Sequence, residues 1–366
     1  MLQPKEGRID GAHYLPTTPE TCLWGRLPNR DRPPVLRVAS GDTVTIDTLS
    51  HEGILEDQGR DPVTYLAGFG VPAGEVLDDA RDLAASGVAH DYDVDGPHVV
   101  TGPIEVAGAE PGDVLRVDTL GLLIRAPYGF ISSRHGYGAL PGEYPETAPD
   151  SGPGADGDRA YNSVCEFIEV IEEAGRLHGT LPYGQGRAAR FPLAPFLGLM
   201  GVASDTSDPV HSVPPGGHGG NLDIKELQVG SSLYLPVHIP GAGFYTGDPH
   251  YAQGNGEVAL TALEAPLRAT LRLTVIPRAE ASTLLGMLDE PFAETATHWM
   301  PLGLHEDLDE AVRRAVRAAV GFLAATQGMP RHSALAYLSG AADFEISQVV
   351  DGIKGVHCMI RKADFR

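Results

Sequence analysis

The sequence predicts an α+β fold that is β-rich, with β-sandwich or barrel-like modules and a C-terminal α/β element. Two observations indicate the sheets. The chain has 45 glycines and 30 prolines without a repeating period, which implies many turns, and several stretches alternate apolar and polar residues as half-buried strands do. A third observation, helical patterns followed by short apolar runs after residue 307, indicates the C-terminal element.

The predicted strands of the N-terminal half follow turns made of glycine and a polar residue. Residues 35–49 predict two strands around Gly41, where Val44 and Ile46 alternate with polar neighbours. Residues 112–120 repeat this pattern, and residues 230–237 repeat it more weakly. Duplication or convergent turn chemistry explains the likeness equally well, and both imply a chain rich in strands.

Helices are predicted where apolar residues recur at helical spacing, at 76–86 and more strongly at 308–327. Asp307 is the expected N-cap of the second helix and Gly328 its expected C-cap. A short helix at 333–338 and strands at 344–350 and 355–360 complete the C-terminal element.

The length of 366 residues allows two or three modules. A stretch rich in Pro, Gly, Glu and Asp at 139–159 is read as a loop that serves as a lid or an oligomer contact, and as a boundary. The predicted organisation is an N-terminal β-rich module, a connecting region, a motif-bearing β module and a C-terminal α+β module, at residues 1–138, 139–190, 191–280 and 281–366.

Charge and composition exclude several classes of function. The formal net charge of −22 and the lack of clustered Lys and Arg argue against nucleic acid as a partner. The three cysteines are far apart, so neither a disulfide framework nor a cysteine zinc site is expected. Neither a secretory signal nor an apolar run of membrane-spanning length is visible, and we expect a cytoplasmic protein.

The most informative stretch is residues 247–257, where Asp248, His250, Gln253 and Glu257 stand among three glycines. In an extended segment Asp248 and His250 point to the same side, because side chains alternate with period two. A carboxylate and an imidazole on one face suit a divalent metal such as Zn²⁺. The alternative is a polar surface turn between two strands.

Glu264 follows an apolar run at 258–263 that reads as a strand. Val258, Leu260, Ala262 and Glu264 are every second residue, so in a strand their side chains point to the same face. Burial of that face would bury the carboxylate of Glu264 as well. A buried carboxylate must be paired, bound to a metal or raised in pKa, and each condition suits a general base for water. The alternative is a solvated Glu just beyond the strand.

A nucleophilic serine or cysteine has little support. The chain has no G-x-S-x-G turn, Ser132 and Ser133 are followed by Arg134 rather than Lys, and Cys165 has no nearby Lys motif. A metal-activated water is the more economical nucleophile. The glycine-rich backbone at 216–220 could then donate N–H groups to the tetrahedral oxyanion.

Several ordered motifs resemble those of the acetamidase/formamidase family. They are PPGGHGGNLD at 214–223, the strand at 230–237, GDPHYAQGNGE at 247–257, the strand ending in Glu264, HVVTGPI at 98–104, GAEPGD at 108–113 and DFEISQVVD at 343–351. The likeness covers most of the chain. Asn255 departs from it, because the family usually carries Asp there, which puts in doubt a role for a charge at this position.

The resemblance implies a metal-dependent hydrolase that cleaves the C–N bond of a small linear amide, formamide- or acetamide-like, to a carboxylate and ammonia. The catalytic candidates are Glu264, His250 and His98. The candidates for substrate binding are Gly219, Gly220, Asn221 and Gln253, and those for metal binding are Asp248, His250, His98, His51 and Asp57. Zn²⁺ is the leading metal, with Ca²⁺ or Mn²⁺ also open. Members of the family assemble, so a homo-oligomer is expected.

Two other classes of function stay open at this stage. One is a non-catalytic β protein that binds a small molecule, and the other is a hydrolase of a different non-peptide C–N bond. The discriminating feature is whether Asp248, His250 and Glu264 converge in one site, which a binding module does not require. We further expect Asp248, His250 and His98 to lie together. The sequence names neither the amide nor the metal.

Overall fold

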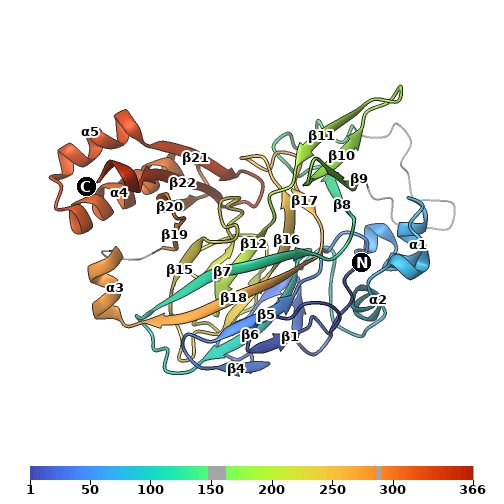
Figure 1. The fold of residues 1–366 in the computed structure, drawn as a ribbon, viewed down its shortest axis with the longest axis horizontal. Helices are drawn as coiled ribbons and strands as arrows, with labels where there is room; N and C mark the ends of the chain where they lie inside the picture. Colours follow the sequence, from blue (N-terminus) through green and yellow to red (C-terminus); the bar gives the residue numbers. More distant parts are fainter. Residues whose placement is uncertain (147–161, 286–289, 366) are drawn as a thin grey trace.

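The computed structural model describes residues 1–146, 162–285 and 290–365. Two large sheets dominate this part of the chain, and most of the helices lie at its two ends (Figure 1). The predicted β-rich α+β class is therefore confirmed. The predicted loop at 139–159 lies in part outside the described residues, and the predicted domain boundaries stay a prediction.

The first sheet has nine strands, and all of its pairings are antiparallel except that of β1 with β5. In the order in which they pair, the strands are β1 (His13–Leu15), β5 (Thr43–Asp47), β18 (Leu267–Ile276), β7 (Val114–Ile124), β15 (Ser232–Pro236), β19 (Phe292–Glu294), β20 (His298–His305), β22 (Lys354–Arg361) and β21 (Asp343–Gln348).

The second sheet has eleven strands, of which β6 (Val99–Val106) pairs with β16 and branches to β2 (Cys22–Trp24) and β4 (Leu36–Val38). The others follow the order β11 (Ala188–Pro192), β10 (Arg176–Pro182), β9 (Ser163–Glu173), β8 (Tyr128–Arg134), β17 (Leu263–Glu264), β16 (Phe244–Ala252), β12 (Phe196–Val202) and β14 (Gly219–Asn221). The short strands β3 (Arg26–Leu27) and β13 (Val210–His211) form a separate pair.

The largest apolar core lies between the two sheets. It joins Leu271 of β18 and Val117 of β7 to Met200 of β12, Phe244 of β16 and Ile104 of β6, and all five are at most 1% exposed. Burying one such side chain contributes on the order of 1.5–3 kcal/mol. This shared core holds the two sheets in a fixed relation, and so holds the side chains that they carry.

Helices close the two ends of the molecule (Figure 1). At the N-terminal end lie α1 (Pro62–Ala67), α2 (Asp78–Ala84) and the 3₁₀ turns η1 (Glu56–Gln58) and η2 (Ala73–Glu75). At the other end lie α3 (Arg278–Leu285), α4 (Leu308–Gln327), α5 (Arg331–Ala341) and η3 (Lys362–Asp364).

Helix α4 packs closely on β20 because Gly303 leaves room for it. A Cβ at Gly303 would stand 2.2 Å from the backbone oxygen of Ala311. The helix begins after Asp307, whose side chain accepts from the backbone N–H of Glu310, and ends at Gly328 with a φ of 63°. The predicted bounds and both predicted caps of this helix are confirmed.

The prediction of a strand at 258–263 is wrong for most of these residues. Residues 258–261 form a turn and a bend, and only Leu263 and Glu264 are in a strand. The backbone turns because Glu257 and Leu260 have φ of 49° and 123°, and the N–H of Leu260 bonds back to the carbonyl of Glu257. Val258 is exposed as a result. Glu264 is nevertheless buried, through its pairing in β17 rather than through the parity of a longer strand.

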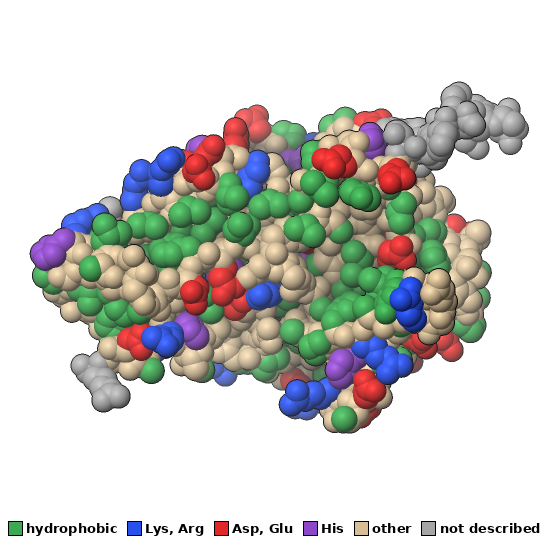
Figure 2. All heavy atoms as spheres, turned by 90° about the horizontal axis from the view of Figure 1, so that it is seen from above, with side chains coloured by type: hydrophobic (Ala, Val, Ile, Leu, Met, Phe, Trp, Pro, Cys, Tyr) green, Lys and Arg blue, Asp and Glu red, His purple; other side chains and the backbone are tan. Residues whose placement is uncertain are grey.

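No helix among the described residues is both long enough and apolar enough to cross a membrane. On the face seen in Figure 2, lysine and arginine side chains stand in small separate groups among acidic and apolar ones.

Candidate active site

Imidazoles and carboxylates from four distant segments meet beside a cavity. His51 follows β5, His98 precedes β6, Asp248 lies in β16 and Glu264 ends β17. All four side chains are buried, with 1% to 5% of each residue exposed. The site draws on both large sheets, so their common core fixes its geometry.

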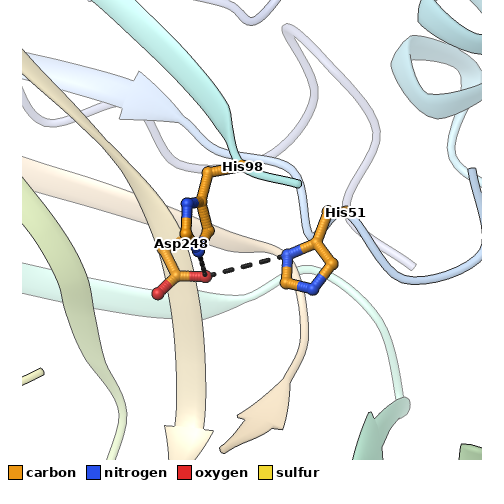
Figure 3. A group of neighbouring side chains, drawn as sticks. All are labelled: His51, His98 and Asp248. Carbon is orange, nitrogen blue, oxygen red and sulfur yellow. Dashed lines mark ion pairs between the residues drawn. The ribbon is translucent and has the colours of Figure 1, made fainter. Parts of the chain in front are cut away.

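Asp248 is the centre of this group. Its Oδ1 lies 3.6 Å from Nε2 of His98 and 3.8 Å from Nδ1 of His51, and Figure 3 shows both rings directed at this one oxygen. The other ring nitrogen of His98, Nδ1, lies 2.9 Å from Oγ of Ser212. That contact orients the ring and leaves Nε2 available for a ligand on the side of Asp248.

His250 connects Asp248 to Glu264. Its Nε2 lies 3.0 Å from Oδ2 of Asp248 and 2.9 Å from Oε1 of Glu264. Strand register explains the second contact, since His250 and Glu264 stand opposite each other in the pairing of β16 with β17. His250 is fully buried and does not line the cavity, so it positions the two carboxylates from behind.

Three acidic residues around the site adopt left-handed backbone conformations. Asp223, Asp248 and Glu257 have φ of 50°, 49° and 49°, a region that non-glycine residues seldom occupy. Room for the side chains of Asp223 and Asp248 comes from Gly198 in β12, where a Cβ would stand 2.4 Å from Oδ1 of Asp223 and 2.7 Å from Oδ2 of Asp248. Such local strain persists where the surrounding fold enforces it, and it is concentrated at functional sites.

A paired ionic network lies behind His51. Glu52 Oε1 is 3.3 Å from Nε2 of His51 and 3.1 Å from Nη1 of Arg134, and Nε of Arg134 is 2.8 Å from Asp57. Burial raises the pKa of Glu52, but the charges of Arg134 and His51 outweigh this and hold it well below its usual range. Burial lowers the pKa of His51, but the neighbouring carboxylates raise it above its usual value.

The central groups differ in the direction of their pKa shifts. Burial lowers the pKa of His98 to about 4, so this imidazole is neutral at pH 7 and can act as a ligand. Burial also lowers the pKa of His250, but Glu264 and Asp248 raise it well above the usual value. Burial raises the pKa of Asp248, yet His250 and His98 bring it far below its normal range. For Glu264, burial and the charge of Asp248 raise the pKa.

A second layer of carboxylates surrounds His250. Asp223 Oδ1 lies 3.9 Å from its Nδ1, and Glu257 Oε1 lies 4.0 Å from its Nε2. Burial and mutual repulsion raise the pKa of Asp223 and of Glu257 well above normal, and burial raises the pKa of Asp351 to about 7. So many acidic groups in one buried region favour a bound cation.

The side chains present fit a divalent metal. His51, His98 and Asp248 offer ligand atoms that all lie within 4.8 Å of one another, as do Asp248, His250 and Glu264. Within the described residues, both ring nitrogens of His51, Oδ1 of Asp248 and Oε2 of Glu264 are buried without a hydrogen-bond partner. Buried polar atoms are rarely left unpartnered, so a ligand for these atoms is expected. Two imidazoles and a carboxylate suit Zn²⁺ better than Ca²⁺, which prefers oxygen ligands alone.

The cavity beside these groups has a volume of about 220 Å³. Its wall includes His51, His98, Asp248, Glu264 and Asn221. Further lining residues give it a mixed polar and aromatic character, among them His90, Tyr92, Arg134, Tyr137, His211, Val213, Glu257 and Asp351. A small polar molecule in the cavity therefore reaches both the imidazole–carboxylate group and hydrogen-bonding side chains.

The structure brings together His51, His98, Asp248, His250 and Glu264, as expected from the sequence.

The structure places the other candidate residues differently. Asp57 lies against Arg134 rather than among the ligand groups, and Gln253 donates to the carbonyl oxygens of Asp223 and Ser347. Gly219 and Gly220 pair with β12 and do not line the cavity, whereas Asn221 does.

Three residues that shape the site were not among the candidates predicted from the sequence. Gly198 gives space to Asp223 and Asp248, Arg134 neutralises Glu52, and Asp351 lines the cavity. Asp351 ends the stretch 343–351, whose resemblance to the family was a signal that could have found it. Gly198 and Arg134 gave no comparable signal, because their partners are distant in the sequence.

Comparison with known proteins finds similarity to acetamidases and formamidases. The model of the Acetamidase/Formamidase family matches residues 203–360. The formamidase of Methylophilus methylotrophus is 31% identical over 202 residues, which is 46% of this chain and 49% of that protein. The acetamidase of Mycolicibacterium smegmatis is 28% identical over 218 residues, which is 46% of this chain and 50% of that protein. The chain thus spans about half the length of the curated relatives it matches.

The fold resembles a solved structure over nearly its whole length. The crystal structure of an acetamidase from Bacillus halodurans has a TM-score of 0.70 and 25% identity, and the match covers 96% of this chain and 98% of that one. The likeness therefore includes the N-terminal segments that supply His51 and His98, which lie outside the span of the family model.

Proposed function

We propose that this protein hydrolyses the C–N bond of a small linear amide and that the reaction depends on a divalent metal. The proposal rests on the place of the chain in the acetamidase/formamidase family. The products would be a carboxylate and ammonia. The observation that carries the proposal is the meeting of His51, His98, Asp248 and Glu264 at one cavity wall, where several of their polar atoms have no hydrogen-bond partner among the described residues.

His51, His98 and Asp248 are the residues that would hold the metal. Their ligand atoms point at a common region, and the contact of His98 Nδ1 with Ser212 keeps the opposite nitrogen free for it. When bound there, a metal such as Zn²⁺ polarises the amide carbonyl and lowers the pKa of water. Arg134 and Glu52 support this group from behind by holding the ring of His51.

Glu264 is the proposed general base, and it lines the cavity next to Asp248. Its carboxylate takes a proton from the attacking water and delivers it to the leaving nitrogen. The imidazole of His250, 2.9 Å away, holds one oxygen of Glu264 in place. The other oxygen, Oε2, has no hydrogen-bond partner among the described residues and is available for the proton.

Asn221 is the side chain best placed to bind the amide. It lines the cavity, and its Oδ1 is buried without a hydrogen-bond partner among the described residues. An acceptor at this position can receive an N–H of the substrate amide, and a buried acceptor discriminates strongly against molecules that lack the donor.

Ammonia release from a panel of amides tests the proposal. The panel should run from formamide and acetamide to longer acyl groups, because a cavity of about 220 Å³ leaves room beyond the smallest amides. Glu264→Gln keeps the shape of the side chain and removes the base, so we expect turnover to fall by about 10²–10⁴. Glu172→Gln on the exposed side of β9 is the matched control and should leave turnover unchanged.

Two results would count against the proposal. If amides bind in the cavity without ammonia release, the chain is a binding protein. If Glu264→Gln turns over the best amide at nearly the normal rate, the base is another carboxylate, for which Glu257 is the first candidate because it also lines the cavity.

We also propose that the protein is a homo-oligomer. Tyr137, Leu140 and Tyr144 are exposed apolar side chains on one loop, and exposed Val258 lies beside it, since the N–H of Ala139 bonds to the carbonyl of Val258. Clusters of this kind often mark an interface. A monomer mass in light scattering at micromolar concentration would contradict the assembly.

A further inference from the structure

A group of ligating side chains lies outside the active site, at the C-terminal β-hairpin. Its members are Glu226 in the loop before β15, Glu345 in β21 and His357 in β22. Their ligand atoms all lie within 4.8 Å of one another. None of the three lines the active-site cavity, and none belongs to the groups around Asp248.

His357 is fully buried and points into this group. Its Nδ1 lies 2.8 Å from Oγ of Ser347, which fixes the ring, and its Nε2 lies 3.2 Å from Oε2 of Glu226 and 3.9 Å from Oε2 of Glu345. Neither Nε2 of His357 nor Oε2 of Glu226 has a hydrogen-bond partner among the described residues. The two atoms are close enough for an ion pair, and two ligands of one metal ion lie equally close together.

The spacing of these atoms also fits a metal. Two ligands at roughly 2.0–2.1 Å from a tetrahedral zinc ion stand about 3.3 Å apart. The distance between Nε2 of His357 and Oε2 of Glu226 is 3.2 Å. One imidazole and two carboxylates form a ligand set that borderline divalent metals accept.

The other polar contacts do not balance the two carboxylates or provide a hydrogen bond for Nε2 of His357. Lys225 Nζ lies 3.8 Å from Glu226 and 3.9 Å from Glu345, but its side chain is 33% exposed and can move into solvent. The side-chain amide of Asn255 donates to Glu345. One ammonium thus faces two carboxylates, and the buried nitrogen of His357 is left without a hydrogen-bond partner among the described residues.

We propose that Glu226, Glu345 and His357 form a second, structural binding site for a divalent metal of the zinc class. Such a site cross-links the hairpin β21–β22 to the loop before β15, which carries Glu226. It lies next to the loop that carries Glu257, because Asn255 contacts Glu345, Gly256 bridges to Gln348 and Gln253 donates to Ser347. The metal would therefore stabilise one edge of the active site without touching substrate.

Metal counting tests this site independently of any amide hydrolysis. Protein stripped with EDTA is equilibrated with micromolar Zn²⁺, and bound zinc per chain is measured by mass spectrometry for the wild type, His357→Gln and His98→Gln. We expect His357→Gln to bind one zinc fewer than the wild type and to lose part of the rise in melting temperature that zinc produces. His98→Gln should keep this site.

Lys225→Gln separates a metal site from an ion-pair network. If a metal binds, removing the competing ammonium raises the zinc affinity of this site, by about fivefold for an ion pair worth about 1 kcal/mol. If the group is only an ion-pair network, Lys225→Gln lowers the melting temperature and leaves zinc binding unchanged. That result, or an equal zinc count in wild type and His357→Gln, would overturn the proposal. Should His357→Gln fail to fold, Glu345→Gln, on the partly exposed ligand, is expected to lose the same zinc ion.

Discussion

Two buried ionic groups in this protein differ in how their charges are matched. Asp47 is fully buried, and its carboxylate lies 2.5 and 2.8 Å from two guanidinium nitrogens of Arg268 and 2.6 Å from the hydroxyl of Tyr14. Asp248 is almost as buried, but its Oδ1 faces two imidazoles without a hydrogen bond among the described residues. A carboxylate satisfied by its own chain serves the fold, and one left unsatisfied indicates a ligand.

The largest effect is expected from Asp248 itself. Asp248→Asn removes the charge shared by the groups with His51, His98 and His250, so both metal binding and turnover should be lost, with turnover falling by at least about 10³. The free energy of unfolding should fall as well, because Asn removes a charge that His250 and His98 stabilise in the folded protein. Zinc content, ammonia release and thermal unfolding of one preparation measure all three, and normal zinc content with normal turnover would contradict this prediction.

The opposite pattern is expected from the satisfied group. Arg268→Met leaves Asp47 without its main partner, and breaking a buried ion pair typically costs about 3–5 kcal/mol of unfolding free energy. Turnover per folded molecule should stay close to normal, since Arg268 lies outside the cavity. Urea unfolding measures the loss. Arg278→Met, at an exposed arginine, is the control and should change stability by no more than about 0.5 kcal/mol.

A third substitution tests whether space near Asp248 matters as much as charge. Gly198→Ala places a methyl group against Asp223, Asp248 and His250, and we expect metal affinity and turnover to fall by about 10–100-fold. Gly321→Ala in α4 is the matched control, because a Cβ there meets open space. It should stabilise the protein by up to about 1 kcal/mol. Equal turnover in the two variants would show that the crowding at Gly198 does not constrain the site.

The smallest effect concerns a half-buried histidine outside the cavity, His218. Nε2 of His218 has no hydrogen-bond partner among the described residues, and burial lowers the pKa of this imidazole to about 4. The unfolded chain takes up the proton near pH 6.5, so the stability tied to neutral His218 is complete above that pH and is lost as the pH falls toward 4. His218→Gln should therefore lose stability less steeply than the wild type between pH 6.5 and 4 in urea unfolding. Parallel curves would contradict this linkage.

Features that depend on residues close together in the sequence were predicted well, and features that depend on distant residues were not. Helix α4 was predicted at both ends because its caps and apolar face lie within one short stretch. The burial of Glu264 was predicted for a wrong reason, since the strand assumed at 258–263 is mostly turn. Strand alternation assumes an extended backbone, whereas Glu257 and Leu260 have positive φ angles and turn the chain.

The convergence of the histidines and carboxylates was predictable from the sequence, but the residues that support them were not. Histidines and carboxylates within the family motifs are predictable candidates, because these residue types commonly bind metals or transfer protons. The supporting roles of Gly198 and Arg134 depend on strands that meet only in three dimensions, as β12 meets β16 and β8 meets β17. A single sequence carries no record of such pairings.

The central claim is that His51, His98 and Asp248 hold a divalent cation that amide hydrolysis requires. The most direct measurement is ammonia release by EDTA-stripped protein before and after Zn²⁺ is restored, with the wild type, His98→Gln and His357→Gln compared. We predict that restored zinc revives the wild type and His357→Gln but not His98→Gln. Full ammonia release by the stripped wild type, or full recovery of His98→Gln, would contradict the claim.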